Sequence, residues 1–231
     1  MKILAVIPAR GGSKGIKNKN LVNFNGKPLI YWTIQAAKKS KLISEIVVST
    51  DSKAIQKFSE KVGVKVDQLR PKSLSQDDSL TIDVIQFELE KLNKKKIFPN
   101  YIVTLQPTSP LRNENHIDKA IKMICRDKNA DSLVSCIKIP HNYSPESLMV
   151  KSKNYLINSK FHKNIFRRQD KKTYFARNGA AIYITKTSKI RNYIFGGKIL
   201  AFEMDFFTSI DIDTLTDLKL AETIKKYEFN K

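Results

Sequence analysis

The chain has 231 residues, of which 41% are hydrophobic and 28% charged, so it fits one α/β domain with a modest appendage and is not a disordered protein. Its longest apolar runs are strand-sized, which excludes a membrane span, and its two cysteines exclude a disulfide scaffold and a cysteine-based zinc site. The net charge is +20, but only eight of the 42 basic residues are arginines, and the lysines are scattered.

This charge is interpreted as solvated surface that attracts anionic substrates, because base readout and bidentate phosphate binding favour arginine. A non-catalytic basic protein that binds nucleic acid remains the minority alternative. The first residues enter an expected strand and lack the apolar core and cleavage site of a signal peptide, so we expect a cytoplasmic protein.

Strands and helices alternate through the first part of the chain. The sequence predicts strands at 2–8, 45–50, 64–69, 101–105 and 131–137, and helices at 28–39, at 51–62 with Asp51 as N-cap, at 80–92 and around 117–124. Such alternation predicts an α/β fold, with a Rossmann-like, mostly parallel sheet covered by helices on both faces.

The alternation stops after Pro140. Residues 141–172 are polar, with short expected strands at 147–151 and 155–157, and we interpret them as an arm inserted into a single domain of residues 1–231. The arm is too short and polar to bury a core of its own, so we expect it to pack against a second subunit. Strands at 180–185 and 198–203 and a helix from 214 to about 227 complete the expected elements.

A glycine-rich loop follows the first expected strand, where open α/β sheets place their ligands. Gly11 and Gly12 allow the backbone to approach an anion closely, while Arg10 and Lys14 supply charged donors and Ser13 a hydroxyl. The spacing matches neither a P-loop nor a dinucleotide-binding motif. The loop therefore predicts a phosphate site of another type.

Two aspartates, Asp211 and Asp213, form the second chemical signal. In an extended segment, residues two apart project to the same face, so both carboxylates can reach one cation. Hard oxygen ligands of this kind suit Mg²⁺, which would bridge phosphate oxygens. Capping of the helix that starts near Thr214 is the alternative role for this pair.

Several segments carry a resemblance to a known family. They are IPARGGSKGIKNKN (7–20), FNGKPLIYWTI (24–34), VSTD (48–51), Arg70-Pro71 with Asp77, LQPTSPLR (105–112), Asn178-Gly179-Ala180 and SIDID (209–213). In this order they resemble the acylneuraminate cytidylyltransferases, the CMP-sialic acid synthetases. The resemblance covers essentially the whole chain and is weakest in the arm. It implies a fold of the nucleotide-diphospho-sugar transferase type and a homodimer in which the arm reaches the partner's sugar pocket.

The resemblance also implies an enzyme that joins CTP to a nine-carbon sugar acid, a nonulosonic acid, and releases pyrophosphate. The implied nucleotide-binding residues are Arg10, Gly11, Gly12, Ser13, Lys14, Lys19, Asn20, Arg70, Asp77 and Thr81. Arg10, Lys14 and Asp211 would carry catalysis by positioning and charge neutralisation, with Mg²⁺ on Asp211 and Asp213. No general base is evident.

The sugar pocket is where the match loosens. Gln106 matches a residue placed against the sugar acid, and Arg168, Arg177 and Asn178 are the further candidates. The family pattern R-P-N-G-A-I-Y aligns on either Arg177 or Asn178, and a slip of one residue in a strand turns a side chain to the other face. Which of these two faces the sugar therefore stays open.

The sugar also stays open, with sialic, legionaminic, pseudaminic and the eight-carbon Kdo acids as alternatives. The GGSKG-IKNKN form of the loop argues against Kdo, whose synthetases usually open with a different loop. A glycosyltransferase of related fold should carry an Asp-x-Asp motif at mid-chain, and this chain has none there.

Overall fold

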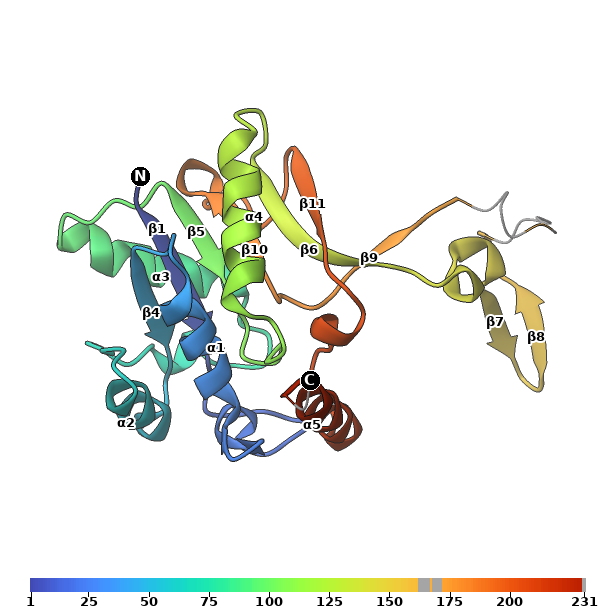
Figure 1. Cartoon of the computed structure of the whole chain (residues 1–231), viewed down its shortest axis with the longest axis horizontal. Helices are drawn as coiled ribbons and strands as arrows, with labels where there is room; N and C mark the ends of the chain where they lie inside the picture. Colours follow the sequence, from blue (N-terminus) through green and yellow to red (C-terminus); the bar gives the residue numbers. More distant parts are fainter. Residues whose placement is uncertain (162–166, 168–171, 230–231) are drawn as a thin grey trace.

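A seven-stranded sheet forms the centre of the computed structural model, which describes residues 1–161, 167 and 172–229 (Figure 1). The strands lie in the order β11-β6-β10-β5-β1-β4, and β9 pairs with β6 outside this path. Their bounds are β1 (Ile3–Pro8), β4 (Glu45–Ser49), β5 (Tyr101–Thr104), β6 (Ser132–Lys138), β9 (Phe175–Arg177), β10 (Tyr183–Lys186) and β11 (Ile199–Glu203). A small hairpin of β2 (Asn23–Phe24) and β3 (Lys27–Pro28) lies apart.

Five of the seven strands run in the same direction, as expected, and β9 and β10 run against them. Strand β1 pairs in parallel with both β4 and β5, and β11 pairs in parallel with β6. Strand β10 is antiparallel to both β5 and β6, and so joins two parallel blocks. The prediction of a mostly parallel sheet is confirmed.

Helices cover both faces of the sheet because its strands are apolar on both sides. Alternate residues of β1 divide between the faces: Ile3, Ala5 and Ile7 share a core with α1 and α4, whereas Leu4 and Val6 pack with α3. The helices are α1 (Leu29–Lys39), α2 (Lys53–Lys61), α3 (Thr81–Lys94), α4 (Glu114–Arg126) and α5 (Leu215–Phe229). None of the helices described is both long and apolar enough to span a membrane.

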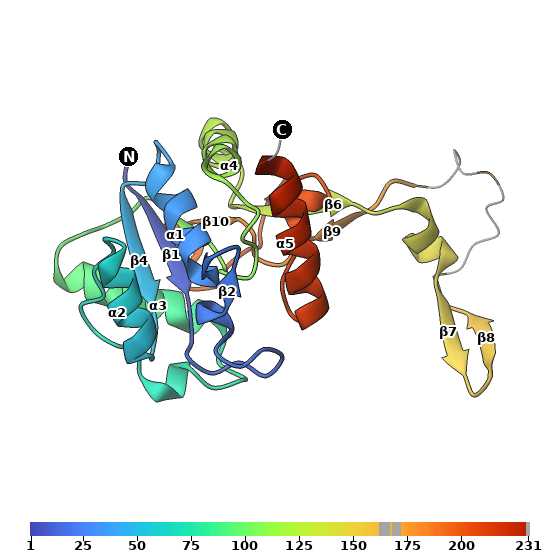
Figure 2. The same cartoon turned by 60° about the horizontal axis from the view of Figure 1, so that its bottom comes forward.

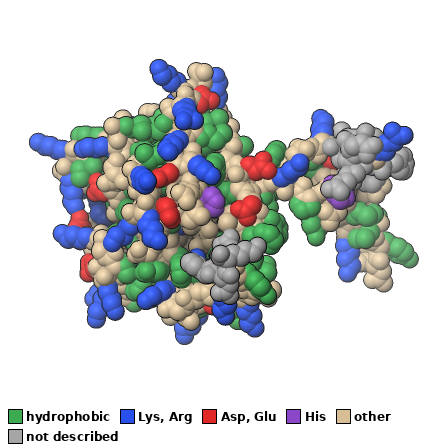
Figure 3. Space-filling view, in the orientation of Figure 1, with side chains coloured by type: hydrophobic (Ala, Val, Ile, Leu, Met, Phe, Trp, Pro, Cys, Tyr) green, Lys and Arg blue, Asp and Glu red, His purple; other side chains and the backbone are tan. Residues whose placement is uncertain are grey.

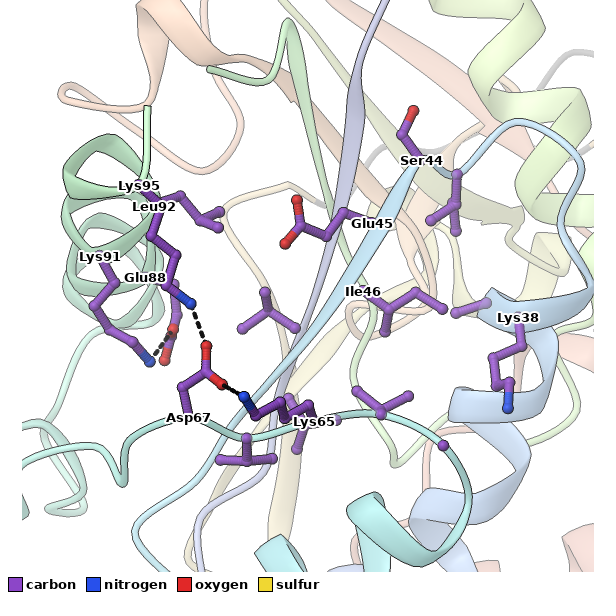
Figure 4. Close-up of a pocket in the computed structure, with 17 residues that line it drawn as sticks. Lys38, Ser44, Glu45, Ile46, Lys65, Asp67, Glu88, Lys91, Leu92 and Lys95 are labelled. Atoms are coloured by element: carbon purple, nitrogen blue, oxygen red, sulfur yellow. Dashed lines mark hydrogen bonds and ion pairs between the residues drawn. The ribbon is translucent and has the colours of Figure 1, made fainter. Parts of the chain in front are cut away.

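The strand expected at 64–69 is wrong. These residues run beside the outer edge of β4 but form no strand. A backbone hydrogen bond joins the residues that follow the two segments, from the Arg70 N–H to the Thr50 carbonyl at 2.7 Å. A cavity of about 530 Å³ separates the two segments (Figure 4). The Gln56 side chain donates to the Val66 carbonyl, and Asp67 pairs with Lys95, the residue that follows α3, so this segment has partners other than β4.

The N-cap expected for α2 is also wrong by one residue. Ser52, not Asp51, occupies the cap, and its hydroxyl accepts a hydrogen bond from the Ile55 N–H at 3.4 Å. The Asp51 carboxylate instead accepts from the Gly11 N–H at 2.8 Å. A loop partner distant in sequence has therefore replaced the local capping contact.

The arm projects far from the sheet, as Figures 1 and 2 show. Its neck is formed by β6 and β9, and its tip by the hairpin of β7 (Met149–Ser152) and β8 (Tyr155–Asn158). Every residue of this hairpin is exposed. Apolar side chains lie on the projecting part in Figure 3, and they include Leu148, Met149, Val150, Tyr155, Leu156 and Ile157. The tip of the arm is an isolated two-stranded ribbon of the kind that needs further packing.

Candidate functional site

The glycine-rich loop leaves β1 at its carboxyl end and is organised by its own polar groups. The Ser13 hydroxyl donates to the Ile16 carbonyl at 2.7 Å and accepts from the Lys19 N–H at 3.0 Å. The Asn20 side-chain amide donates to the Arg10 carbonyl at 2.8 Å. Ser13 and Asn20 thus shape the loop, while an added Cβ at Gly12 would meet nothing within 4 Å.

A cavity of about 250 Å³ lies beside this loop, at the carboxyl ends of β1 and β5. Four residues expected around a nucleotide line it together, namely Arg10, Arg70, Asp77 and Thr81. Gln106, which was expected against the sugar acid, lines it as well, 96 positions from Arg10. Pro8, Leu74 and Val84 supply apolar walls. The enclosure combines charged donors, amide groups and apolar surface, as a nucleoside site requires.

Arg70 lies deep in this cavity, with 5% of its surface exposed. Its Nε donates to the Ser75 hydroxyl at 3.0 Å. Burial lowers the pKa of Arg70, while the carboxylates of Asp51 and Glu88 oppose this shift. The guanidinium is therefore held by the interior of the protein and directed by it, as recognition of a base edge demands.

Gln106 is positioned by a residue that the sequence did not single out. Arg112 is 2% exposed, and its guanidinium donates to the Gln106 carbonyl at 3.3 Å, the Ala181 carbonyl at 3.0 Å and the Thr33 hydroxyl at 2.7 Å. Burial lowers the pKa of Arg112 to about 9. An arginine that ends a run of proline-bounded turn residues is the only sequence signal for this role.

Asp77 pairs with both cations of the loop. The Arg10 Nη1 lies 2.7 Å from Asp77 Oδ1, and the Lys14 Nζ lies 2.8 Å from Asp77 Oδ2. Hydrogen bonds from Lys14 and Arg10 lower the pKa of this exposed carboxyl. The two expected phosphate ligands thus meet at one carboxylate.

The two aspartates of the second signal sit in different surroundings. Asp213 is exposed and pairs with Lys19 at 2.8 Å, whereas Asp211 Oδ1 is buried and has no hydrogen-bond partner within the described part of the chain. Burial raises the pKa of Asp211, the charge of Asp213 adds to this shift, and Thr108 and Lys19 oppose it. Asp211 therefore has an oxygen free to accept a cation.

Neither aspartate caps α5. Thr214 does so: its hydroxyl accepts from the Asp217 N–H at 3.3 Å, and the Asp217 carboxylate accepts from the Thr214 N–H at 2.7 Å. This reciprocal pair is a capping box. The capping alternative for Asp211 and Asp213 is wrong: the Asp213 carboxylate pairs with Lys19, and the Asp211 carboxylate lies against Gly179.

Arg177 and Asn178 diverge at the end of β9. The Asn178 side chain is 5% exposed and is bonded to the hydroxyls of Ser135 at 2.6 Å and Ser209 at 2.8 Å. The Arg177 guanidinium is exposed and lies 4.5 Å from the centre of the Phe195 ring. Of the two, Arg177 is the side chain that a ligand can reach.

The Asp211 carboxylate lies next to the residues that follow β9. A Cβ added at Gly179 would come 2.6 Å from Asp211 Oδ2, so the carboxylate lies directly on the glycine. Burial raises the pKa of Tyr183, which Arg177 opposes and the Asp211 charge reinforces. Arg177, Tyr183 and Asp211 therefore form one neighbourhood, in which Tyr183 and Thr108 were not expected from the sequence.

The sequence also predicted Arg168 and a metal ion at this site. Arg168 lies outside the described residues. Within the described ranges no group of three or more histidine, cysteine or acidic side chains is arranged to hold a metal ion. A cation on Asp211 and Asp213 would need further oxygens, such as those of a phosphate, which is the usual coordination of Mg²⁺.

The sequence of this chain is similar to those of known cytidylyltransferases. A cytidylyltransferase family model matches residues 4–230. The N-acylneuraminate cytidylyltransferase of Escherichia coli O18:K1:H7 is 31% identical over 97% of this chain, which spans about half (52%) of that protein. The pseudaminic acid cytidylyltransferase of Campylobacter jejuni serotype O:23/36 is 30% identical over 98% of this chain and 97% of its own length.

Solved structures share the fold. A CMP-2-keto-3-deoxy-manno-octonic acid synthetase complexed with CTP superposes with a TM-score of 0.72 at 19% identity, covering 99% of this chain and all of that one. A 4-diphosphocytidyl-2C-methyl-D-erythritol synthase from Anaerococcus prevotii superposes with a TM-score of 0.61 at 16% identity, covering 97% and 98%. At these identities the likeness concerns the fold, and it confirms the expected nucleotide-diphospho-sugar transferase type.

Proposed function

The chain belongs to the cytidylyltransferase family, and on that premise we propose that it transfers CMP from CTP to a nonulosonic acid and releases pyrophosphate. The observation that carries the proposal is the 250 Å³ cavity, where Arg70, Thr81 and Gln106 meet Arg10 of the glycine-rich loop. Relatives named for N-acylneuraminate and for pseudaminic acid support the sugar class. The proposed location is the cytoplasm.

The cytidine would occupy the cavity, with the triphosphate along the loop. Arg70 and Thr81 would recognise the base, and the side chains of Arg10 and Lys14 would neutralise phosphate charge. Ser13, Lys19 and Asn20 hold the loop in shape through the contacts described above, with Gly11 and Gly12 allowing close approach of the phosphates. In this reaction catalysis needs positioning and charge neutralisation, with no covalent intermediate.

Asp211 and Asp213 fit a resident Mg²⁺. The buried, unpartnered Asp211 Oδ1 is the observation in favour, since a lone buried carboxylate oxygen is otherwise costly. Asp213 would join after exchanging its contact with Lys19. When bound, the ion would neutralise charge that develops on the phosphates.

The sugar acid would lie between Asp211 and Arg177. Arg177 would bind the sugar's carboxylate, and Gln106 and Arg168 would add polar contacts. Asn178 was expected to touch the sugar, but its burial against Ser135 and Ser209 favours a role in holding the β9 end in place. The sugar's anomeric hydroxyl would attack the α-phosphorus of CTP as pyrophosphate leaves.

Pyrophosphate release tests the whole proposal. The protein is incubated with CTP, Mg²⁺ and, in separate reactions, sialic, legionaminic, pseudaminic and Kdo acids, and each nucleoside triphosphate replaces CTP in turn. Release that requires CTP and one nine-carbon acid is the expected result. Release with none of the acids, together with tight binding of RNA or DNA, would favour the nucleic-acid alternative.

Alanine replacement of the loop cations should weaken CTP binding. Arg10→Ala and Lys14→Ala each remove a charged donor, and we expect CTP affinity to fall by roughly ten- to a hundredfold for each. Calorimetric titration with CTP measures the effect, with Lys17→Ala, a substitution in the same segment, as the control. If both variants bind CTP like the parent, the loop is not the phosphate site.

We also propose a homodimer formed through the arm. The hairpin places Val150 opposite Ile157, so these apolar side chains share one face, whereas Asn158 lies on the other. Exposed apolar side chains on an otherwise unsupported ribbon favour burial against a second copy of the chain. The partner's arm would then bring Arg168 toward the sugar.

Sedimentation tests this interface. Ile157→Asp should convert the dimer to a monomer and reduce activity with the sugar acid, because a charge would be buried in the interface. Asn154→Asp introduces the same charge at the turn between the two strands, away from the apolar side chains of either face, and should leave the dimer intact. A fully active monomeric parent protein would exclude the shared site.

A further inference from the structure

Asp77 bridges the two cations that the proposed function assigns to the phosphates of CTP. Its two oxygens divide between two cations, with Oδ1 at 2.7 Å from Arg10 Nη1 and Oδ2 at 2.8 Å from Lys14 Nζ. These are the two side chains of the glycine-rich loop best suited to a nucleotide's phosphates. A bridging carboxylate with one oxygen on each cation reproduces what two oxygens of a phosphate would offer them.

The segment that presents Asp77 is built to hold it there. The Gln76 carbonyl accepts a second bond from Arg10 Nη1 at 3.1 Å, and the Gln76 N–H donates to the Ser79 hydroxyl at 2.9 Å. Ser79 in turn donates to the Ser73 carbonyl at 3.1 Å. Because Gln76, Asp77 and Ser79 all line the 250 Å³ cavity, the contact closes the side of that cavity next to the loop.

The contact is also easily reversed. The Asp77 side chain is 49% exposed and that of Lys14 is 78% exposed, so water can replace each partner as it leaves. Exposed ion pairs contribute little to stability, and their displacement by a polyvalent anion is correspondingly easy. A triphosphate cannot share Arg10 and Lys14 with Asp77, because the like charges would lie a few ångströms apart.

We propose that Asp77 is a stand-in anion: it holds Arg10 and Lys14 in place while the site is empty, and the nucleotide's phosphates displace it. The inference rests on the proposed function and assigns Asp77 a positioning role in place of direct contact with the nucleotide. Competition with Asp77 weakens the binding of CTP, and it equally weakens the binding of the product pyrophosphate. Asp77 thereby favours release of pyrophosphate after transfer.

The test compares Asp77→Asn with Asp78→Asn by calorimetric titration at low ionic strength. Asp78 is the adjacent exposed carboxyl, for which no ion pair is described, so its variant makes the same change of charge outside the contact. We expect Asp77→Asn to bind CTP and inorganic pyrophosphate about three- to tenfold more tightly than the parent, and Asp78→Asn to bind both within about twofold of it. Pyrophosphate should also become a stronger product inhibitor of Asp77→Asn.

Two additional variants locate the cause. Asp77→Glu keeps the charge and should bind pyrophosphate like the parent. In a Lys14→Ala background, Asp77→Asn should raise pyrophosphate affinity less than in the parent, because one of the two competing pairs is gone.

Other outcomes would overturn the inference. Unchanged or weaker pyrophosphate binding by a folded Asp77→Asn protein would do so, and weaker CTP binding with unchanged pyrophosphate binding would make Asp77 a ligand of the nucleoside. If the parent protein binds neither CTP nor pyrophosphate, the proposed function itself fails. Failure of the inference alone is recognised by a parent that binds both.

Discussion

Asp211→Asn is expected to lower turnover by about 10²- to 10³-fold while leaving the fold intact. Asparagine has the size of aspartate but removes the charge and one of the two oxygens that a cation would use. Asp213→Asn should also lose most turnover, for the same reason. Steady-state pyrophosphate release measures both, and turnover by the parent in excess chelator would exclude the metal assignment.

Asp211→Asn, which should lower turnover, is expected to make the folded protein more stable at neutral pH. Because burial raises the pKa of Asp211 above its value in the unfolded chain, the folded protein binds the proton more tightly, and its stability falls as pH rises through that pKa. Asp211→Asn lacks this penalty, so with chelator present its melting temperature should match the parent's in acid and exceed it at neutral pH. The exposed Asp213 is not expected to show this gain. Equal melting temperatures of Asp211→Asn and its parent at neutral pH would contradict the account.

Gly179→Ala is expected to abolish most activity, and Gly26→Ala is its matched control. Both glycines have positive φ, +67° at Gly179 and +80° at Gly26, so alanine strains the backbone at either position by about 1 kcal/mol. At Gly26 the new methyl group meets nothing within 4 Å, whereas at Gly179 it would press on the Asp211 carboxylate. The melting temperature should therefore fall in both variants, while turnover should be lost in Gly179→Ala alone. Similar turnover in the two variants would show that the close approach to Asp211 does not matter.

Local sequence patterns were sufficient to predict most elements of the fold. The apolar β-branched runs of β1, β4 and β5 and the periodic stripe of α3 appear within a few residues of their expected bounds. At 64–69 the prediction of a strand failed: the alternating valines are buried, but the Val66 carbonyl accepts from the Gln56 side chain and the Asp67 side chain pairs with Lys95, just after α3. Alternation predicts burial of a face, and it does not reveal whether the neighbouring strand edge is within reach.

The candidate site was predictable as a set of residues but not as a set of contacts. The cavity brings together Arg10 and Arg70, both expected at the nucleotide, with Gln106, which was expected at the sugar acid. The pairing of Lys19 with Asp213 joins residues 194 positions apart, and no local pattern encodes it. Which of Arg177 and Asn178 is exposed to a ligand likewise could not be predicted, because it depends on the hydrogen bonds that bury Asn178 against Ser135 and Ser209.

The place of β6 in the sheet affects how the chain emerges from the ribosome. All three strands that pair with β6, namely β9, β10 and β11, follow it in the sequence. At about 5–20 residues per second, the roughly 60 residues between the end of β6 and the start of β11 take several seconds to synthesise. Both edges of β6 stay open until β9 and β10 are made, and the edge that β11 covers stays open to the end of the interval. An open strand edge is prone to pair with another chain. Synthesis of the arm therefore delays the pairing of β6 with the strands that complete the sheet.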